Sequence, residues 1–130
     1  MATSFLTALA TPPAGGLVLR NTRTGRVIAD RLLPALDSES RRRGLLKHTS
    51  LDEGEAMIIA PTNAVHTWFM KFDIDIAFVT RDGRVLKTRD SVPPWRMSGA
   101  FGGYAVIEMR GGSFAAADTV PGDVLEVVAR

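Results

Sequence analysis

The chain has 130 residues, of which 45% are hydrophobic and 23% charged, and its formal net charge is +2. This size and composition predict one soluble globular domain with its own core. Because the sequence contains no cysteine, it excludes disulfides, thiolate nucleophiles and sulfur-ligated metal sites. The two histidines, His48 and His66, supply at most two imidazole ligands, and a carboxylate would have to be the third. We therefore expect no metal site and no cofactor.

The amino-terminal segment, MATSFLTALATPPAG, lacks the basic start of a secretory signal, and Pro12 and Pro13 interrupt its apolar stretch. We predict a flexible tail over residues 1–15 and a single domain over residues 16–130. No stretch approaches the roughly 20 apolar residues that cross a bilayer, so we expect no membrane association. These features favour a cytoplasmic protein.

The first predicted elements are two strands, over residues 16–21 and 26–34, on either side of a turn at Thr24-Gly25. The second run alternates with a two-residue period, which is typical of a strand. A short helix is predicted over residues 38–47, with Asp37 or Ser38 as its N-cap.

After this helix the pattern is almost entirely that of strands. Asp82-Gly83 is a strong hairpin signal between two of them. Ser113 is expected to cap a short helical segment over residues 113–118. The sequence thus predicts a mainly β, compact single-domain sandwich or barrel-like fold of about eight strands with one or two short helices. The strand-length runs in this part are residues 55–61, 66–72, 75–81, 84–92, 104–110 and 123–129.

The stretch HTWFMKF contains the first candidate site residue, His66. As a strand, residues 66–72 would place His66 at the edge of an apolar face that also carries Trp68, Met70 and Phe72. A histidine there is either packed with its nitrogens satisfied or lines a pocket beside Thr67 and Lys71. Packing is the commoner outcome.

Two acidic residues are the other candidates within the strands. Asp75 precedes the apolar run IAFV, so its carboxylate must be paired or hydrogen-bonded. A structural role, fastening a turn, is favoured over catalysis. Glu108 shares a strand face with Tyr104 and Val106 under simple alternation, and that face need not be buried.

Trp95 and Phe101 lie in a loop predicted over residues 93–103, which also holds two prolines and three glycines. Large aromatic side chains on a loop either pack back onto the domain or meet a ligand. The basic cluster of Arg41, Arg42, Arg43 and Lys47 could attract phosphates, but a run this short is typical of a solvated helix face.

Three segments taken in order, RRRGLLKHTSL, HTWFMKFDIDIAFVTRDGRVL and YAVIEMRGGSFAAADTVPGDVLEV, resemble the DUF192 family of small prokaryotic proteins of unknown function. The resemblance covers about residues 17–129 and implies a compact mainly β sandwich, but no activity. Some members carry secretion signals, from which this amino terminus departs. The residues that match the family motifs are Arg41, Gly44, Leu45, His66, Met70, Lys71, Asp75, Glu108, Gly111, Gly122 and Asp123.

We predict a module that binds a small polar or anionic ligand at one end of the sheet. One alternative is a protein- or RNA-interaction module that uses the basic helix and the Trp95 loop, although nucleic acid is the less favoured partner. Another is a hydrolase with His66 as its acid–base group. The candidate ligand-binding residues are His66, Thr67, Lys71, Asp75, Trp95 and Glu108, and the basic face comprises Arg41, Arg42, Arg43 and Lys47.

Overall fold

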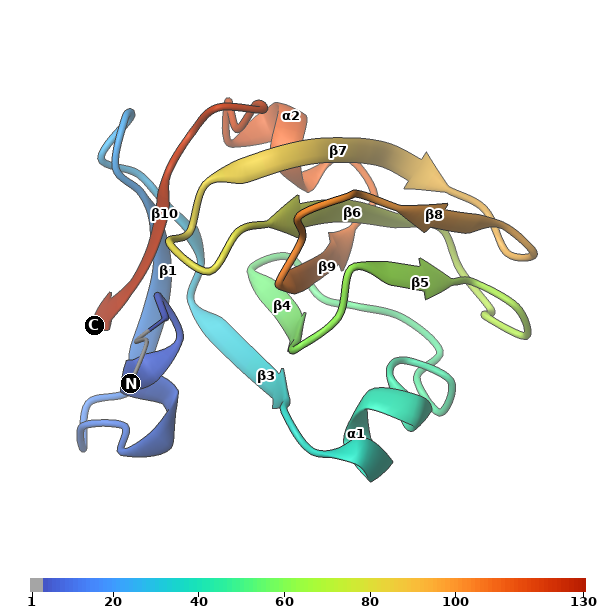
Figure 1. Cartoon of the computed structure of the whole chain (residues 1–130), viewed down its shortest axis with the longest axis horizontal. Helices are drawn as coiled ribbons and strands as arrows, with labels where there is room; N and C mark the ends of the chain where they lie inside the picture. The colour runs from blue at the N-terminus through green and yellow to red at the C-terminus, as the bar shows by residue number, and fades with distance from the viewer. Residues whose placement is uncertain (1–3) are drawn as a thin grey trace.

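The computed structural model describes residues 4–130, within which ten strands, two short α-helices and one 3₁₀ helix form (Figure 1). The helical elements are η1 (Thr7–Ala10), α1 (Ser38–Arg43) and α2 (Ser113–Ala116). The strands are β1 (Leu17–Asn21), β2 (Val27–Ala29), β3 (Arg31–Ala35), β4 (Glu55–Ile59), β5 (Ala64–His66), β6 (Ile74–Val79), β7 (Val85–Val92), β8 (Met97–Gly99), β9 (Ala105–Arg110) and β10 (Leu125–Ala129).

The strands form three sheets. The largest has the order β3-β4-β9-β6-β7, in which β3 and β4 are parallel and the other neighbours antiparallel. A second sheet has the order β10-β1-β2, and β5 pairs with β8 in the third. The prediction of a mainly β, compact single domain is confirmed, and the sheets do not close into a barrel.

The five-stranded sheet is covered on both sides, which we name the β1 face and the α1 face. On the β1 face, alternate side chains such as Ile58 and Ile107 pack against Leu19 and the rest of the three-stranded sheet. On the α1 face, Ile59 and Val106 share a core with residues that follow α1. Figure 1 shows α1 below this sheet, with β1 and β10 to its left. Every residue of β6 and nearly every residue of β9 is consequently buried.

Several predicted elements differ from the observed ones. The strand predicted over residues 66–72 is wrong, because β5 ends at His66 and Phe69 adopts a left-handed backbone with φ of 65°. The strand predicted over residues 26–34 is two strands, β2 and β3, which break at Asp30 and join different sheets. The loop predicted over residues 93–103 contains β8.

Of the two predicted helix N-caps, one is observed and the other is not. Between the two candidates predicted for α1, Asp37 is the N-cap, and its side chain accepts a hydrogen bond from the Ser40 amide at 2.8 Å. The helix ends at Arg43, because Gly44 has a positive φ of 45°. Ser113 does not cap α2; the N-cap is Gly112, and the Ser113 hydroxyl donates to the Arg110 carbonyl.

The predicted flexible tail covers residues 1–15, of which 1–3 lie outside the described residues. Residues 5–9 of the remainder pack against the domain, whereas residues 10–15 are exposed. Leu6 is buried in the core of the β1 face, and the Phe5 amide donates to the Arg81 carbonyl at 2.9 Å. The hairpin predicted at Asp82-Gly83 is present between β6 and β7.

Candidate functional site

A pocket of about 540 Å³ lies between α1 and the five-stranded sheet, and we call it the α1 pocket. Its apolar wall includes Leu45, Ile59 and Met70, while hydroxyl groups come from Ser38 and Thr62. The charged or titratable lining residues are Arg41, Arg42, Arg43, His66 and Glu108. Apolar walls with a few convergent polar groups are the usual composition of a small-molecule site.

Glu108 forms part of the pocket wall from the middle of β9. It lies between Met57 of β4 and Ile76 of β6, and only 4% of its surface is exposed. Within residues 4–130 no group donates a hydrogen bond to its carboxylate, whose oxygens keep some contact with the open space of the pocket. Burial therefore raises the pKa of Glu108 from 4.5 to about 7. A buried carboxyl group without a partner costs stability, so its presence in a pocket marks a candidate functional residue.

The prediction that Glu108 need not be buried is wrong. The alternation along β9 was assigned correctly, since Val106 and Glu108 lie on one face and Ile107 and Met109 on the other. The sequence does not show that α1 and the segments after it cover that face. A polar residue on a predicted outer face is therefore enclosed.

The arginines enter the pocket from the last turn of α1. The Arg41 guanidinium donates to the Leu36 carbonyl at 2.8 Å and to the Ala60 carbonyl at 3.4 Å, which fix its position beside the sheet. Arg43 has a long contact of 4.0 Å to Glu39, and both groups are largely exposed. Arg42 is exposed, and within residues 4–130 it forms no ion pair. Lys47, the fourth member of the predicted basic face, does not line the pocket.

His66 is the last residue of β5 and is exposed beside the pocket. Its ring stacks on that of Trp68, with 4.7 Å between the ring centroids and 26° between the planes. His66 and Glu108, from different predicted strands, thus line the same cavity.

Asp75 lies on the opposite face of the sheet from Glu108. In the β6–β9 register, Asp75 pairs with Met109 and Ile76 pairs with Glu108, so the two acids differ by one step of the alternation. The buried Asp75 carboxylate accepts hydrogen bonds from the Ser91 amide at 2.8 Å and from two amides near the start of α2, those of Gly112 and Phe114, each at 3.0 Å. Its carboxylate holds three chain segments together and does not face the α1 pocket.

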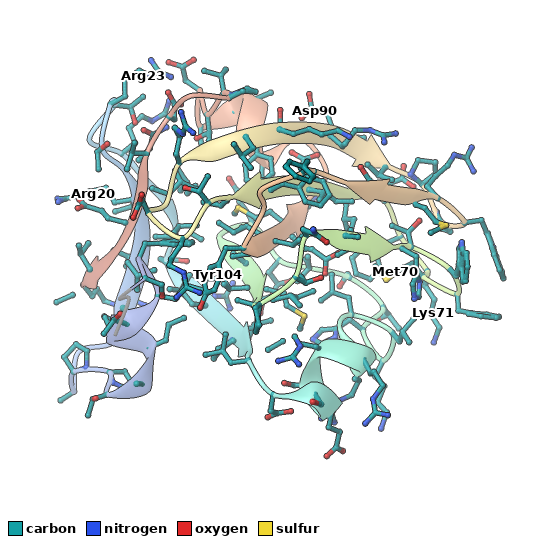
Figure 2. The ribbon with its side chains drawn as sticks, viewed as in Figure 1. Arg20, Arg23, Met70, Lys71, Asp90 and Tyr104 are labelled. Atoms are coloured by element: carbon teal, nitrogen blue, oxygen red, sulfur yellow. The ribbon has the colours of Figure 1, made fainter. Side chains whose placement is uncertain are left out.

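Thr67, Lys71 and Trp95 do not line the pocket either. The buried Thr67 hydroxyl donates to the Pro93 carbonyl at 2.7 Å and accepts from the Arg96 amide at 2.9 Å, joining the segments after β5 and β7. Lys71 is exposed next to Met70, at the end of the molecule beyond β5 and β8 (Figure 2).

The Thr67→Val substitution is expected to lower the free energy of unfolding by about 1–2 kcal/mol, because it leaves the Arg96 amide and the Pro93 carbonyl without their partner. Urea denaturation followed by tryptophan fluorescence measures the change. Thr88→Val on β7 is the matched control, since Thr88 is half-buried and a β-branched residue suits a strand. Equal stability of the two variants would contradict this role of Thr67.

Four large apolar side chains are exposed around the junction that Thr67 makes between the segments after β5 and β7. We call them the aromatic end: Trp68, Phe69, Trp95 and Met97. The Phe69 and Trp95 rings meet edge to face with 4.7 Å between their centroids. Both residues have a positive φ, of 65° and 69°, which is unfavourable for bulky side chains. The fold therefore holds these rings outward at a conformational cost.

Sequence reasoning missed the apolar and hydroxyl residues of the pocket wall, such as Ile59, Val65 and Thr62. Nothing in their local patterns distinguishes them from ordinary strand and loop residues. Within residues 4–130 no group of three or more histidine, cysteine or acidic side chains could hold a metal ion. In the same range, no helix has the length and apolar character that a membrane span requires.

Comparison with known proteins assigns the chain to a family. The profile of DUF192, described as "Uncharacterized ACR", matches residues 20–127. The chain belongs to the DUF192 family. Six of the residues that carry the family resemblance line the α1 pocket of this DUF192 protein: Arg41, Gly44, Leu45, His66, Met70 and Glu108.

Two solved structures are similar to this DUF192 domain. One, a protein of unknown function from Novosphingobium aromaticivorans DSM 12444, is 27% identical with a TM-score of 0.74, and the match covers 97% of this chain and 99% of the other. The second, a "putative transcription regulator" from Sinorhizobium meliloti 1021, is 19% identical with a TM-score of 0.74, over 88% of this chain and 93% of the other. At that identity the likeness shows the fold alone. No curated protein is significantly similar to the chain.

Proposed function

We propose that this DUF192 protein is a binding domain for a small polar or anionic ligand, which the α1 pocket holds. The observation that carries the proposal is Glu108, a buried carboxyl group without a partner on the wall of a cavity that three arginines also line. The pocket volume of about 540 Å³ lies within the usual range for small-molecule sites. Of the ligand-binding candidates predicted from sequence, His66 and Glu108 line this pocket, together with three arginines of the predicted basic face.

A ligand screen by thermal shift tests the proposal. Organic acids, phosphorylated metabolites and amino acids that bind the α1 pocket are expected to raise the melting temperature of the wild type, and at equal concentration the tighter binders should raise it more. Arg42→Ala should reduce these shifts, because Arg42 lines the pocket. Arg84→Ala is the matched control, since Arg84 is an exposed arginine outside the pocket.

The outcome of this screen separates the site from incidental surface binding. Ligand shifts that are equal in the wild type, Arg42→Ala and Glu108→Gln would exclude the α1 pocket as the binding site. Shifts that disappear in both pocket variants and persist in Arg84→Ala would support it.

The second candidate function is that of an interaction module, and the aromatic end is the observation that favours it. Trp95 is 58% and Phe69 is 68% exposed, and exposed aromatic clusters often mark binding surfaces. Of the four basic residues that this alternative assigned to a partner, Arg41, Arg42 and Arg43 line the α1 pocket. Weaker partner binding by Trp95→Ala but not by Arg42→Ala would support this function over ligand binding. Hydrolysis with His66 as the acid–base group stays a prediction.

A further inference from the structure

The α1 pocket contains charged groups of opposite sign that do not neutralise each other. Glu108 projects from the middle of the five-stranded sheet, whereas Arg41, Arg42 and Arg43 come from α1. Burial is the cause of the raised pKa of Glu108, and no ion pair between Glu108 and an arginine forms within residues 4–130. The pocket thus has an acidic group from the sheet and basic groups from the helix that do not pair with each other.

We propose that the ligand is zwitterionic, with an ammonium group that pairs with Glu108 and an anionic group, joined to it by a short chain, that contacts the arginines. This inference rests on the proposed function of the same pocket. The apolar side chains of Leu45, Ile59 and Met70 line the cavity and would contact the connecting chain.

Each half of this ligand follows from a pocket-lining group that lacks an ion-pair partner among residues 4–130. A buried carboxylate without a donor is costly, and an ammonium group supplies both the opposite charge and the missing hydrogen bonds. A simple anion would leave the Glu108 carboxyl group unpaired. The ionised form of Glu108 would also repel the anion. A simple amine would make no use of Arg42, an exposed arginine that lines the pocket and forms no ion pair within residues 4–130.

Binding of the ammonium group should depend on pH, because the ion pair requires an ionised Glu108. The pKa of Glu108 is about 7, so at lower pH binding must displace the proton of Glu108. The affinity for the zwitterion should then fall by as much as tenfold for each pH unit. The flanking strands present the uncharged Met57 and Ile76, and α1 presents Arg41, Arg42 and Arg43. From β5, the imidazole of His66 also lines the pocket, so His66→Gln is measured in parallel.

The experiment uses the full chain and a series of ω-amino acids with two to seven methylene groups, compared by isothermal titration calorimetry with alkanoates and alkylamines of matched length. One chain length is expected to bind at least tenfold more tightly than its matched alkanoate and amine. Glu108→Gln should remove the advantage over the alkanoate, while Arg42→Ala should remove the advantage over the amine. Arg84→Ala should preserve both.

The possible results distinguish this inference from the proposed function. Alkanoates that bind as tightly as the ω-amino acids, with affinity lost in Arg42→Ala, would overturn the zwitterion and leave an anion-binding pocket. An advantage that survives Glu108→Gln would overturn the assignment of the ammonium group to Glu108. Absence of binding for the whole series would overturn this inference, while inorganic phosphate and the wider thermal-shift screen would still test the pocket itself.

Discussion

Glutamine in place of Glu108 is expected to stabilise the folded protein at pH 8 by as much as about 3 kcal/mol. The pKa of Glu108 is raised from 4.5 to about 7 on folding, so the folded state holds its proton more tightly than the unfolded state. Below pH 4.5 both states are protonated and the effect on stability vanishes. As the pH rises from 4.5 to 7 the unfolded state ionises first, so stability falls, and above pH 7 the penalty is constant. The neutral, nearly isosteric Glu108→Gln escapes this penalty.

Urea denaturation at pH 4 and pH 8 measures the difference. Glu108→Gln should match the wild type at pH 4 and exceed it at pH 8. Glu53→Gln, at an exposed glutamate away from the α1 pocket, is the control and should change neither value. A gain that is the same at both pH values would show that the change is one of packing and not of ionisation. A domain that gives up this much stability for one side chain is expected to use that side chain for binding.

Asp75→Asn is expected to lower the free energy of unfolding by about 3 kcal/mol. The Asp75 carboxylate accepts hydrogen bonds from three backbone amides, those of Ser91, Gly112 and Phe114, in a site without solvent exposure. An asparagine amide can accept with one oxygen only, so its NH₂ group would face a backbone donor and leave that donor unpaired. The loss should appear as a lower midpoint of urea unfolding with an unchanged slope.

Asp90→Asn is the matched control, because Asp90 is an exposed acid on β7 (Figure 2). It should shift stability by no more than about 0.5 kcal/mol. Ligands of the α1 pocket should still raise the melting temperature of Asp75→Asn, because Asp75 lies on the β1 face. A stable Asp75→Asn variant that has lost ligand binding would place Asp75 in the binding site instead of the scaffold.

Local chemistry made part of the fold predictable. Asp82-Gly83 identifies the β6–β7 hairpin and Asp37 identifies the start of α1, because each acts on residues next to it in the chain. The strand expected over residues 66–72 failed for the opposite reason. Its residue types suit a strand, but the observed chain turns at Phe69 in a left-handed conformation that junction contacts, such as those of Thr67, help to hold.

The candidate site was predictable only in pieces. His66 and Glu108 stood out as isolated polar residues in apolar runs, yet their meeting in one cavity depends on α1, β5 and β9, which are distant in sequence. Asp75 was recognised as a residue that needs partners, and the three amides satisfy that need. Its separation from Glu108 depends on a register between β6 and β9 that no single segment specifies.

The placement of the two acids on opposite sides of one sheet has a practical consequence for redesign. Selectivity can be altered by substitutions on α1 and on the sheet side that it covers, while the Asp75 anchor and the core beneath it are left intact. Conversely, substitutions around Leu19 and Ile107 can change thermal stability without changing the groups that contact a bound ligand. Because side chains alternate between the two faces of a strand, ligand selectivity and thermal stability can be adjusted independently.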